Sequence, residues 1–283
     1  MLKLYNGVEI PSLGLGAREI AFGQLGEAEL ARDYNFYIKA ILSGQCSLYD
    51  TSAAYGRNDE ALGRAILDTD SRSRVMIMSK VSNAQQREQS LRRAFEAHLK
   101  YMNTDYLDVY LIHWPQIGTF TKAYLELEKL YEEGLVKAIG VCNCNIHHLK
   151  ELASVANIKP MINQFEITPV FTQDALVNYC KAFDIMPIAY SALGRMHDVL
   201  MKSEPIRVLA QRYKKTPAQI IVKWNQQLSR VALVSTRNEE HFKELFQQNE
   251  DYTLTDKEIC WINSLNDNIR LRYDPDMIDF TVL

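Results

Sequence analysis

Long apolar runs are missing from this chain, since no hydrophobic stretch approaches the roughly 18 residues of a membrane span. Residues 1–7 have no long apolar core of the signal-peptide kind. Net charge is only −3, without the basic footprint that binds nucleic acid or anionic lipid. The five cysteines, an odd number with no Cys-x-x-Cys pair, are typical of reduced thiols. We therefore expect a soluble cytoplasmic protein with no nucleic-acid or membrane partner, and a monomer by default.

Linker-like stretches rich in Pro, Gly and Ser are also missing, as are internal repeats and low-complexity tracts. Short apolar runs instead alternate with helix-like patterns, which favours one α/β domain over residues 1–283. We expect a single (β/α)8 TIM barrel with an N-terminal β-hairpin and an extra C-terminal helix. The hairpin is indicated by Asn6-Gly7 between two short apolar stretches, and we expect it to plug one end of the barrel. The expected strands lie near 13–16, 47–50, 75–80, 106–113, 136–141, 161–164, 185–190 and 231–234.

Helix patterns fill the intervals between these strands. The apolar stripe Leu91, Phe95 and Leu99 predicts one helix over 85–101, and a second is expected over 122–133. Thr216 followed by Pro217 predicts another helix start, with Thr as N-cap and Pro at the first helical position.

Four polar residues in the first 113 positions lie at or just beyond the ends of apolar runs. Asp50, Lys80 and His113 each end a run, and Tyr55 follows five positions after Asp50. An ionisable side chain left unpaired inside a protein is costly, so each must reach water or meet a partner. The carboxyl ends of parallel barrel strands meet at one rim. We therefore expect the four residues to form one site.

These four residue types suit proton transfer to or from a carbonyl. A tyrosine hydroxyl titrates near pH 10, and a lysine ammonium beside it lowers that pKa. Asp50 would keep Lys80 charged and in place, and His113 would donate a hydrogen bond to a developing oxyanion. Taken singly, each residue has a simpler explanation: a structural ion pair for Asp50 and Lys80, a helix start for Tyr55, and a buried, satisfied histidine for His113. Their joint occurrence at strand ends favours catalysis.

The chain resembles the aldo-keto reductase family over nearly its whole length. The motifs that carry the resemblance occur in order: Asp-Thr-Ser-Ala-Ala-Tyr-Gly at 50–56, Met-Ser-Lys at 78–80, Leu-Ile-His-Trp-Pro at 111–115, Gly-Leu-Val-Lys-Ala-Ile-Gly-Val-Cys-Asn at 134–143, Ile-Asn-Gln-Phe-Glu at 162–166, Ala-Tyr-Ser-Ala-Leu-Gly at 189–194 and Thr-Pro-Ala-Gln at 216–219. The resemblance implies a barrel that binds a nicotinamide dinucleotide without a Rossmann domain. In agreement, Gly14-x-Gly16 is followed by Glu19 where the dinucleotide fingerprint needs a third glycine.

The same resemblance assigns roles to individual residues. Tyr55 corresponds to the general acid/base, Lys80 and Asp50 to the residues that tune it, and His113 to the residue that orients the substrate carbonyl. Cofactor contacts are implied for a further set: Asn143 and Gln164 on the nicotinamide carboxamide, Tyr190 stacked on the nicotinamide ring, and Ser191, Leu193 and Gly194 around the pyrophosphate. The activity implied is NAD(P)H-dependent reduction of aldehydes or ketones, in either direction.

The segment after the last strand departs from the family pattern, in which a basic loop grips the 2′-phosphate of NADP. Ser235, His241 and Leu245 occupy positions where lysine, arginine and asparagine are frequent. Thr236, Arg237, Asn238 and Glu244 remain as candidate contacts, and amides at the start of the following helix favour an anion. We expect NADP(H) as cofactor, with NAD(H) as the alternative. Cys142 replaces the serine that shares the carboxamide contact, which puts that contact in doubt because sulfur is a weak hydrogen-bond partner.

The sequence gives the least information about the substrate pocket. Trp114 is a candidate residue of the pocket wall. Arg18 is a candidate partner for a carboxylate or phosphate on the substrate, and the alternative is that Arg18 is a solvated arginine at the barrel rim. The loops after His113 and Gly194 look short, which predicts an open site for small carbonyl compounds.

Two other classes of function remain open from the sequence. A non-catalytic sensor or regulatory subunit would bind the nucleotide on the same barrel, but it would not need all four catalytic positions filled. A metal-dependent hydrolase would need clustered ligands at a strand end. The only adjacent histidines, His147 and His148, follow Asn145 at a predicted helix start, where we expect them to be exposed, and no metal is expected.

Overall fold

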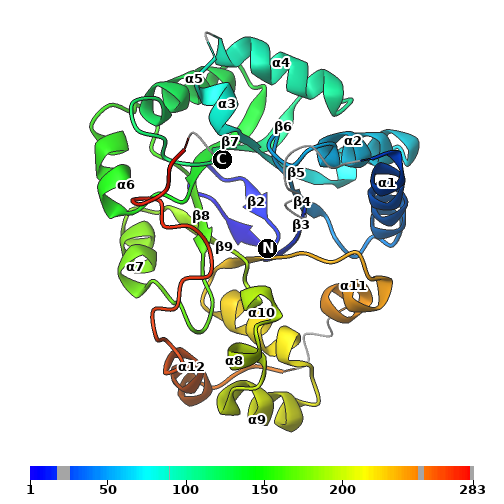
Figure 1. The fold of residues 1–283 in the computed structure, drawn as a ribbon, viewed down its shortest axis with the longest axis vertical. Helices are drawn as coiled ribbons and strands as arrows, with labels where there is room; N and C mark the ends of the chain where they lie inside the picture. The colour runs from blue at the N-terminus through cyan, green and yellow to red at the C-terminus, as the bar shows by residue number, and fades with distance from the viewer. Residues whose placement is uncertain (18–25, 89, 248–251, 281–283) are drawn as a thin grey trace.

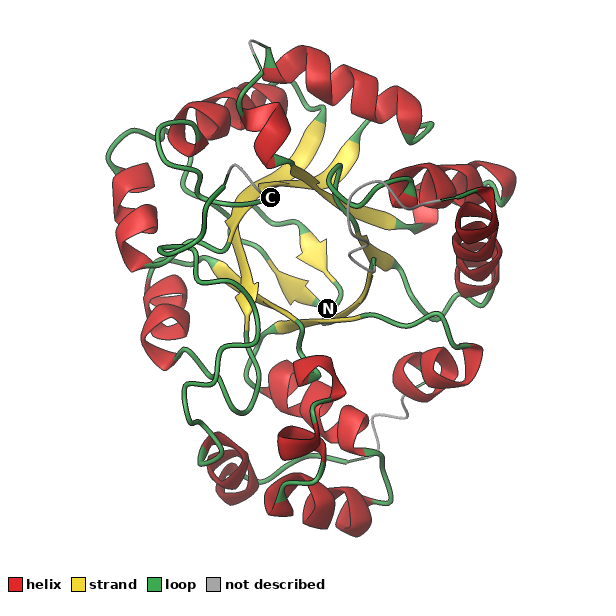
Figure 2. Cartoon of the chain, in the orientation of Figure 1, coloured by secondary structure: helices red, strands yellow, loops and turns green. Residues whose placement is uncertain are grey.

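A computed structural model of the chain describes residues 1–17, 26–88, 90–247 and 252–280. Eight parallel strands form a closed barrel, and pairing of the last strand with the first barrel strand completes the ring (Figure 2). In ring order from that first strand they are β3 (Leu13–Gly16), β4 (Leu48–Asp50), β5 (Met76–Val81), β6 (Leu107–Ile112), β7 (Val136–Cys142), β8 (Ile162–Glu166), β9 (Met186–Tyr190) and β10 (Val231–Val234). All eight predicted strands are confirmed within a few residues.

The helices surround the barrel, so each strand has one face on the barrel interior and the other under a helix (Figure 1). In the described residues they are α1 (Glu27–Leu42), α2 (Asn58–Asp68), α3 (Asn83–Gln86), α4 (Leu91–Tyr101), α5 (Phe120–Glu132), α6 (Ile146–Ala153), α7 (Asp174–Ala182), α8 (Asp198–Met201), α9 (Glu204–Tyr213), α10 (Pro217–Gln227), α11 (Glu239–Phe246) and α12 (Asp256–Asn263), with short 3-10 turns η1 (Arg72–Arg74) and η2 (Gly194–Met196). The final helix, α12, is the expected extra C-terminal helix.

One predicted helix is divided in two. The expected element over 85–101 consists of α3 and α4, because Ser90 starts a new helix by accepting a hydrogen bond from the Arg93 amide. The expected start of α10 is confirmed, since the Thr216 side chain accepts from the Gln219 amide and Pro217 is the first helical residue.

The N-terminal hairpin covers the end of the barrel opposite the strand ends that carry the polar residues. Its strands are β1 (Leu2–Lys3) and β2 (Glu9–Ile10), joined through Asn6 and Gly7. Asn6 Nδ2 donates to the carbonyl of Lys137 at 3.0 Å and Tyr5 OH donates to that of Lys159 at 2.6 Å, and both carbonyls lie near the starts of barrel strands. The hairpin therefore plugs the amino-terminal end, as predicted, and leaves the other end open for a site.

Among the described residues, no helix combines the length and the apolar character that a membrane crossing requires. All five cysteines are free thiols, and only Cys260 is exposed.

Candidate active site

The carboxyl ends of the barrel strands bring the four predicted catalytic residues together. Asp50 is the last residue of β4, Lys80 lies one residue before the end of β5, and His113 follows β6 directly. Tyr55 lies in the turn between β4 and α2. Parallel pairing aligns these strand ends, so side chains distant in sequence become neighbours without any loop having to bend inward.

Asp50 and Lys80 form a buried ion pair. Lys80 Nζ donates to Asp50 Oδ1 and to the carbonyl oxygen of Thr51, each at 2.7 Å. Lys80 is only 1% exposed and Asp50 6%, so the two charges depend on each other. Gln164 Nε2 adds a second donor to Asp50 Oδ1 at 2.8 Å. Two acceptors thereby fix the position of the ammonium, and Gln164 fixes the carboxylate that accepts from it.

Tyr55 and His113 face each other beside this pair. Tyr55 OH lies 3.4 Å from His113 Nε2, with the two rings nearly perpendicular at 77°. Lys80 Nζ lies 5.3 Å from the Tyr55 ring centroid, so the ammonium and the phenol ring are neighbours. A carbonyl oxygen placed at this position would meet a hydroxyl and an imidazole at once.

The His113 ring is neutral. Burial lowers the pKa of His113 well below 6.5, and the positive charges of Lys80 and Arg272 lower it further. Ser52 Oγ lies 3.2 Å from the other ring nitrogen, Nδ1, and fixes the ring orientation. A neutral imidazole with one nitrogen engaged by a hydroxyl has its second nitrogen available for a substrate.

The predicted nicotinamide contacts also lie at this rim. Asn143 follows β7 with a φ of 58°, a left-handed conformation that asparagine tolerates better than most residues. This conformation lets Asn143 Nδ2 donate to the carbonyl of His113 at 3.0 Å, while Asn143 Oδ1 accepts from Tyr190 OH at 2.7 Å. Gln164 lies on the adjacent strand, β8. Two amide side chains and an aromatic ring thus surround one position.

A tight turn follows Tyr190 and contains the three residues predicted to surround the pyrophosphate. Ser191 has a φ of 49°, and the Gly194 amide donates to the Ser191 carbonyl at 2.7 Å. Gly194 itself has a φ of 56°, and a Cβ there would lie 2.7 Å from Leu200 Cδ2. A larger residue at 194 would therefore be strained, and Gly194 itself does not line the active-site cavity.

A cavity of about 340 Å³ connects these groups. Its lining includes all the predicted catalytic residues except Lys80, which lies beneath Asp50, and all the predicted contacts at 143, 164 and 190–193. The lining residues are Gly16, Ala17, Asp50, Tyr55, His113, Trp114, Asn143, Gln164, Tyr190, Ser191, Ala192, Leu193, Arg195, Met196, Leu233, Val234, Ser235 and Arg272. Cys142 is absent from this wall and only 1% exposed, and burial raises the pKa of its thiol. The thiol that replaces the family serine is therefore inert.

The four predicted contacts after β10 are already engaged within the protein. Arg237 forms an ion pair with buried Asp33 of α1, with Nε to Oδ1 at 2.5 Å and Nη2 to Oδ2 at 2.6 Å. Asn238 caps α11, accepting from the Glu240 amide at 2.8 Å, and Thr236 Oγ1 accepts from the Asn238 amide at 3.0 Å.

Glu244 lies on the outer side of this segment. Its carboxylate accepts from the Thr216 hydroxyl and its carbonyl accepts from Gln219 Nε2 at 2.7 Å, so it connects α11 to the start of α10. A contact between the cofactor and Glu244 or the residues at 236–238 remains a prediction.

Of the two predicted substrate contacts, Trp114 lines the cavity and Arg18 lies outside the described residues. The Trp114 ring packs against Phe280 of the C-terminal segment, with centroids 6.3 Å apart. Phe280 does not line the cavity itself, so it supports the Trp114 side chain that does.

Sequence reasoning missed three residues that shape the site. Ser52 lies within the motif at 50–56, and a hydroxyl two residues after the Asp50 carboxylate is the signal that could have indicated its role. Glu166 ends β8, and its carboxylate accepts from the backbone amides of Leu271 at 2.9 Å and Arg272 at 3.0 Å. It thereby brings Arg272 to the cavity, and no local pattern around Arg272 indicates this.

The expectation for the adjacent histidines was wrong in part. His147 is exposed, but His148 is buried at 7% exposure, because it is the third residue of α6 and its Nδ1 accepts from the Asn145 amide at 3.1 Å.

A (β/α)8 barrel with proton-transfer groups in a cavity at the carboxyl end of its strands is the architecture of a barrel enzyme. Residues 12–267 match the model of the aldo/keto reductase family. The chain belongs to this family, and it is an oxidoreductase.

Relatives along the full chain agree with this assignment. An uncharacterized oxidoreductase, YtbE, of Bacillus subtilis is 40% identical, with 98% of this chain and 96% of the relative covered. The glyoxal reductase of the same organism is 36% identical, over 99% of this chain and 97% of its own. Among solved structures, an aldo-keto reductase from a Medee basin deep-sea metagenome library superimposes with a TM-score of 0.87 at 33% identity, covering 99% of this chain and all of its own.

Proposed function

We propose that this protein uses NADP(H) to reduce small reactive aldehydes to alcohols, with Tyr55 as the general acid. One observation carries the proposal: Tyr55 OH and His113 Nε2 lie 3.4 Å apart in the cavity, beside the buried Lys80–Asp50 pair. A substrate carbonyl oxygen between the hydroxyl and the imidazole would receive two hydrogen bonds and then a proton. The bound nicotinamide would supply the hydride.

The protein's own residues prepare this proton transfer. Lys80 directs two of its three donors to Asp50 and Thr51, and its charge stabilises the phenolate that Tyr55 becomes after giving up its proton. Ser52 Oγ lies 3.2 Å from His113 Nδ1, and in the proposed tautomer Ser52 donates to Nδ1, which leaves Nε2–H to donate to the carbonyl oxygen. Because His113 is neutral, it polarises the carbonyl without competing as an acid. After the reaction, Tyr55 takes a proton back from solvent.

The cavity fits a nicotinamide dinucleotide. Asn143 and Gln164 offer amide groups of both polarities to a carboxamide, and the Tyr190 ring offers a flat support for the nicotinamide. The turn after Tyr190 is the proposed contact for the diphosphate, since Ser191 and Leu193 line the cavity. The cavity continues to Val234 and Ser235, in the direction of the loop at 236–238.

Arg237 is the proposed determinant of the choice between NADP(H) and NAD(H). Its guanidinium is the cation nearest the end of the cavity in the described loop after β10, and Asp33 holds it in a fixed orientation. Catalytic efficiency with NADPH and with NADH, measured for wild type and Arg237→Ala, tests this choice. We expect wild type to prefer NADPH and the variant to lose that preference. A wild-type preference for NADH that the substitution leaves unchanged would contradict it.

Small substrates are favoured by the size of the cavity, about 340 Å³, because the cofactor also has to occupy part of it. The 36% identical glyoxal reductase acts, by its name, on a two-carbon dialdehyde, and we extend that class of substrate to this chain. Trp114 is the proposed wall, and Arg18 the proposed contact for an anionic substrate. Equal loss of activity toward charged and neutral carbonyls in Arg18→Met would exclude the ion pair.

The decisive assay follows NADPH absorbance with glyoxal. Tyr55→Phe should lower kcat by about 10²–10⁴-fold, the usual contribution of a general acid, with NADPH binding retained. Tyr110→Phe is the matched control, since Tyr110 is buried on β6 and its hydroxyl has no hydrogen-bond partner among the described residues. Unchanged turnover in Tyr55→Phe would exclude the mechanism. NADPH binding without turnover in wild type would favour the alternative of a non-catalytic sensor.

We further propose that the chain acts as one domain over residues 1–283, as a monomer, in the cytoplasm. Strand pairing between β10 and β3 supports the single domain, because the barrel cannot close without both ends of the chain. Five free thiols, four of them buried, support a reducing compartment.

A further inference from the structure

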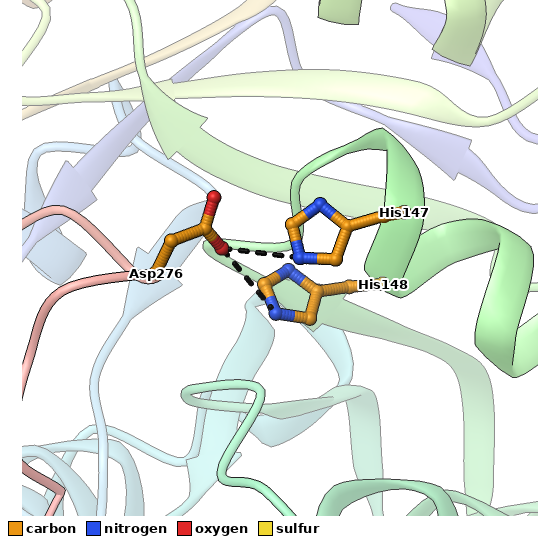
Figure 3. A group of neighbouring side chains, drawn as sticks. All are labelled: His147, His148 and Asp276. Carbon is orange, nitrogen blue, oxygen red and sulfur yellow. Dashed lines mark ion pairs between the residues drawn. The ribbon is translucent and has the colours of Figure 1, made fainter.

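A second cluster of ionisable side chains lies outside the catalytic cavity, where α6 meets the C-terminal segment. His147 and His148 lie in the first turn of α6, and Asp276 approaches them from a turn of that segment (Figure 3). Asp276 Oδ1 is 3.1 Å from His147 Nε2 and 3.6 Å from His148 Nε2. None of the three residues takes part in the proposed reaction.

We propose that His147, His148 and Asp276 form a binding site for a divalent transition-metal ion of the zinc type. Zinc binds imidazole nitrogen and carboxylate oxygen at about 2.0–2.2 Å in tetrahedral geometry, which places neighbouring donor atoms about 3.3–3.6 Å apart. The two measured separations bracket that range, and all three donor atoms lie within 4.8 Å of one another. Magnesium and calcium are disfavoured because they require oxygen donors.

The surroundings orient the carboxylate and leave room for a fourth ligand. Asn145 Nδ2 donates to Asp276 Oδ2 at 2.8 Å, so the other oxygen, Oδ1, is directed at the two imidazoles. A cavity of about 310 Å³ adjoins the three residues, and Glu151, one turn along α6, adds a carboxylate to its lining. Water or Glu151 could complete the coordination.

Ligation by His148 requires one rearrangement. His148 Nδ1 accepts from the Asn145 amide, so the ring proton lies on Nε2, the nitrogen that must face the metal. Metal binding would move this proton to Nδ1 and break the hydrogen bond. Leaving the Asn145 amide without its acceptor reduces affinity by roughly 5- to 150-fold, a cost that the three ligands have to offset. The rearrangement can be measured, since the Asn145 amide should exchange its hydrogen with solvent faster when metal binds.

A bound ion would connect the C-terminal segment to the barrel close to the substrate pocket. Four residues beyond Asp276 the segment reaches Phe280, which packs on Trp114 of the cavity wall. The site does not depend on the proposed reaction, so Tyr55→Phe should bind the metal as wild type does.

The test is calorimetric titration of the untagged full chain with zinc chloride. We expect one ion per chain, and a loss of affinity of at least about tenfold in each of His147→Ala, His148→Gln and Asp276→Asn. Glutamine is the usual residue at this position of a capping box, so His148→Gln preserves an acceptor for the Asn145 amide and isolates the loss of the ligand. Cys260→Ser removes the exposed thiol and should leave binding unchanged.

Hydrogen exchange supplies the second measurement. Zinc should speed exchange of the Asn145 amide and slow exchange in the segment around Asp276. The proposal is overturned if zinc does not bind, if His148→Gln binds as tightly as wild type, or if Cys260→Ser abolishes binding.

Discussion

Breaking the Lys80–Asp50 pair separates its structural role from its catalytic one. Asp50 is 6% exposed, and in Lys80→Met its buried carboxylate loses the ammonium and keeps the hydrogen bond from Gln164 Nε2 at 2.8 Å. Removing one partner of a buried ion pair typically costs about 3–5 kcal/mol of unfolding free energy. The double variant Asp50→Asn, Lys80→Met removes the charge while an amide oxygen still accepts from Gln164. We expect it to regain most of that loss.

Equilibrium urea unfolding of wild type, both single variants and the double variant measures this coupling. Turnover of glyoxal with NADPH, measured on the same samples, should fall by about 10²-fold or more in Lys80→Met and in the double variant, since neither has the lysine charge beside Tyr55. In the double variant the free energy of unfolding should therefore recover while turnover stays low. A double variant as unstable as Lys80→Met would refute the electrostatic account of stability. Near-normal turnover in Lys80→Met would refute the proposal that the Lys80 charge stabilises the Tyr55 phenolate.

Three further outcomes are expected. Asn143→Gly should weaken NADPH binding, measured by fluorescence titration, because the amide side chain is lost. Asn143→Ala should weaken it too, and it should also be about 1 kcal/mol less stable than Asn143→Gly in urea unfolding, because a φ of 58° is unfavourable for alanine. Gly194→Ala should cost at least about 1 kcal/mol, seen as a lower unfolding midpoint, since its Cβ would overlap Leu200. Below about pH 6.5 the unfolded chain protonates His113 while the folded chain does not, so the free energy of unfolding should decrease as pH falls. His113→Gln should make this decrease shallower between about pH 7 and pH 5. The same dependence on pH in the variant and in wild type would contradict the buried, neutral ring.

The barrel could be predicted from the sequence because its strands are short apolar runs with clear ends. Asp50, Lys80 and His113 were found for the same reason, since an ionisable group at the end of a buried strand is visible in one dimension. The closed ring then makes their meeting a geometric necessity. The division of the helix over 85–101 escaped prediction because the apolar stripe continues across the break. Only the capping hydroxyl of Ser90 marks it.

Contacts between distant segments could not be predicted in this way. Arg237 forms an ion pair with Asp33, about 200 positions earlier, on a helix whose orientation no local pattern determines. His148 was expected in solvent because a helix start usually is, yet the C-terminal segment covers it. Both contacts arise where a loop meets a remote element, and a single sequence contains no signal for such a meeting.

The hydrogen bonds from the Leu271 and Arg272 amides to Glu166 have a consequence for protein engineering. They attach the start of the C-terminal segment to the barrel through backbone atoms, so these two bonds are independent of the side chains at 271 and 272, whereas Asp276 and Phe280 attach the rest of the segment through side chains. Residues 267–280 could therefore be exchanged for the corresponding segment of a relative, provided that a carboxylate is kept at 166. Such chimaeras would alter the pocket wall while the catalytic residues stay in place, which makes this segment a module for redesigning substrate selectivity.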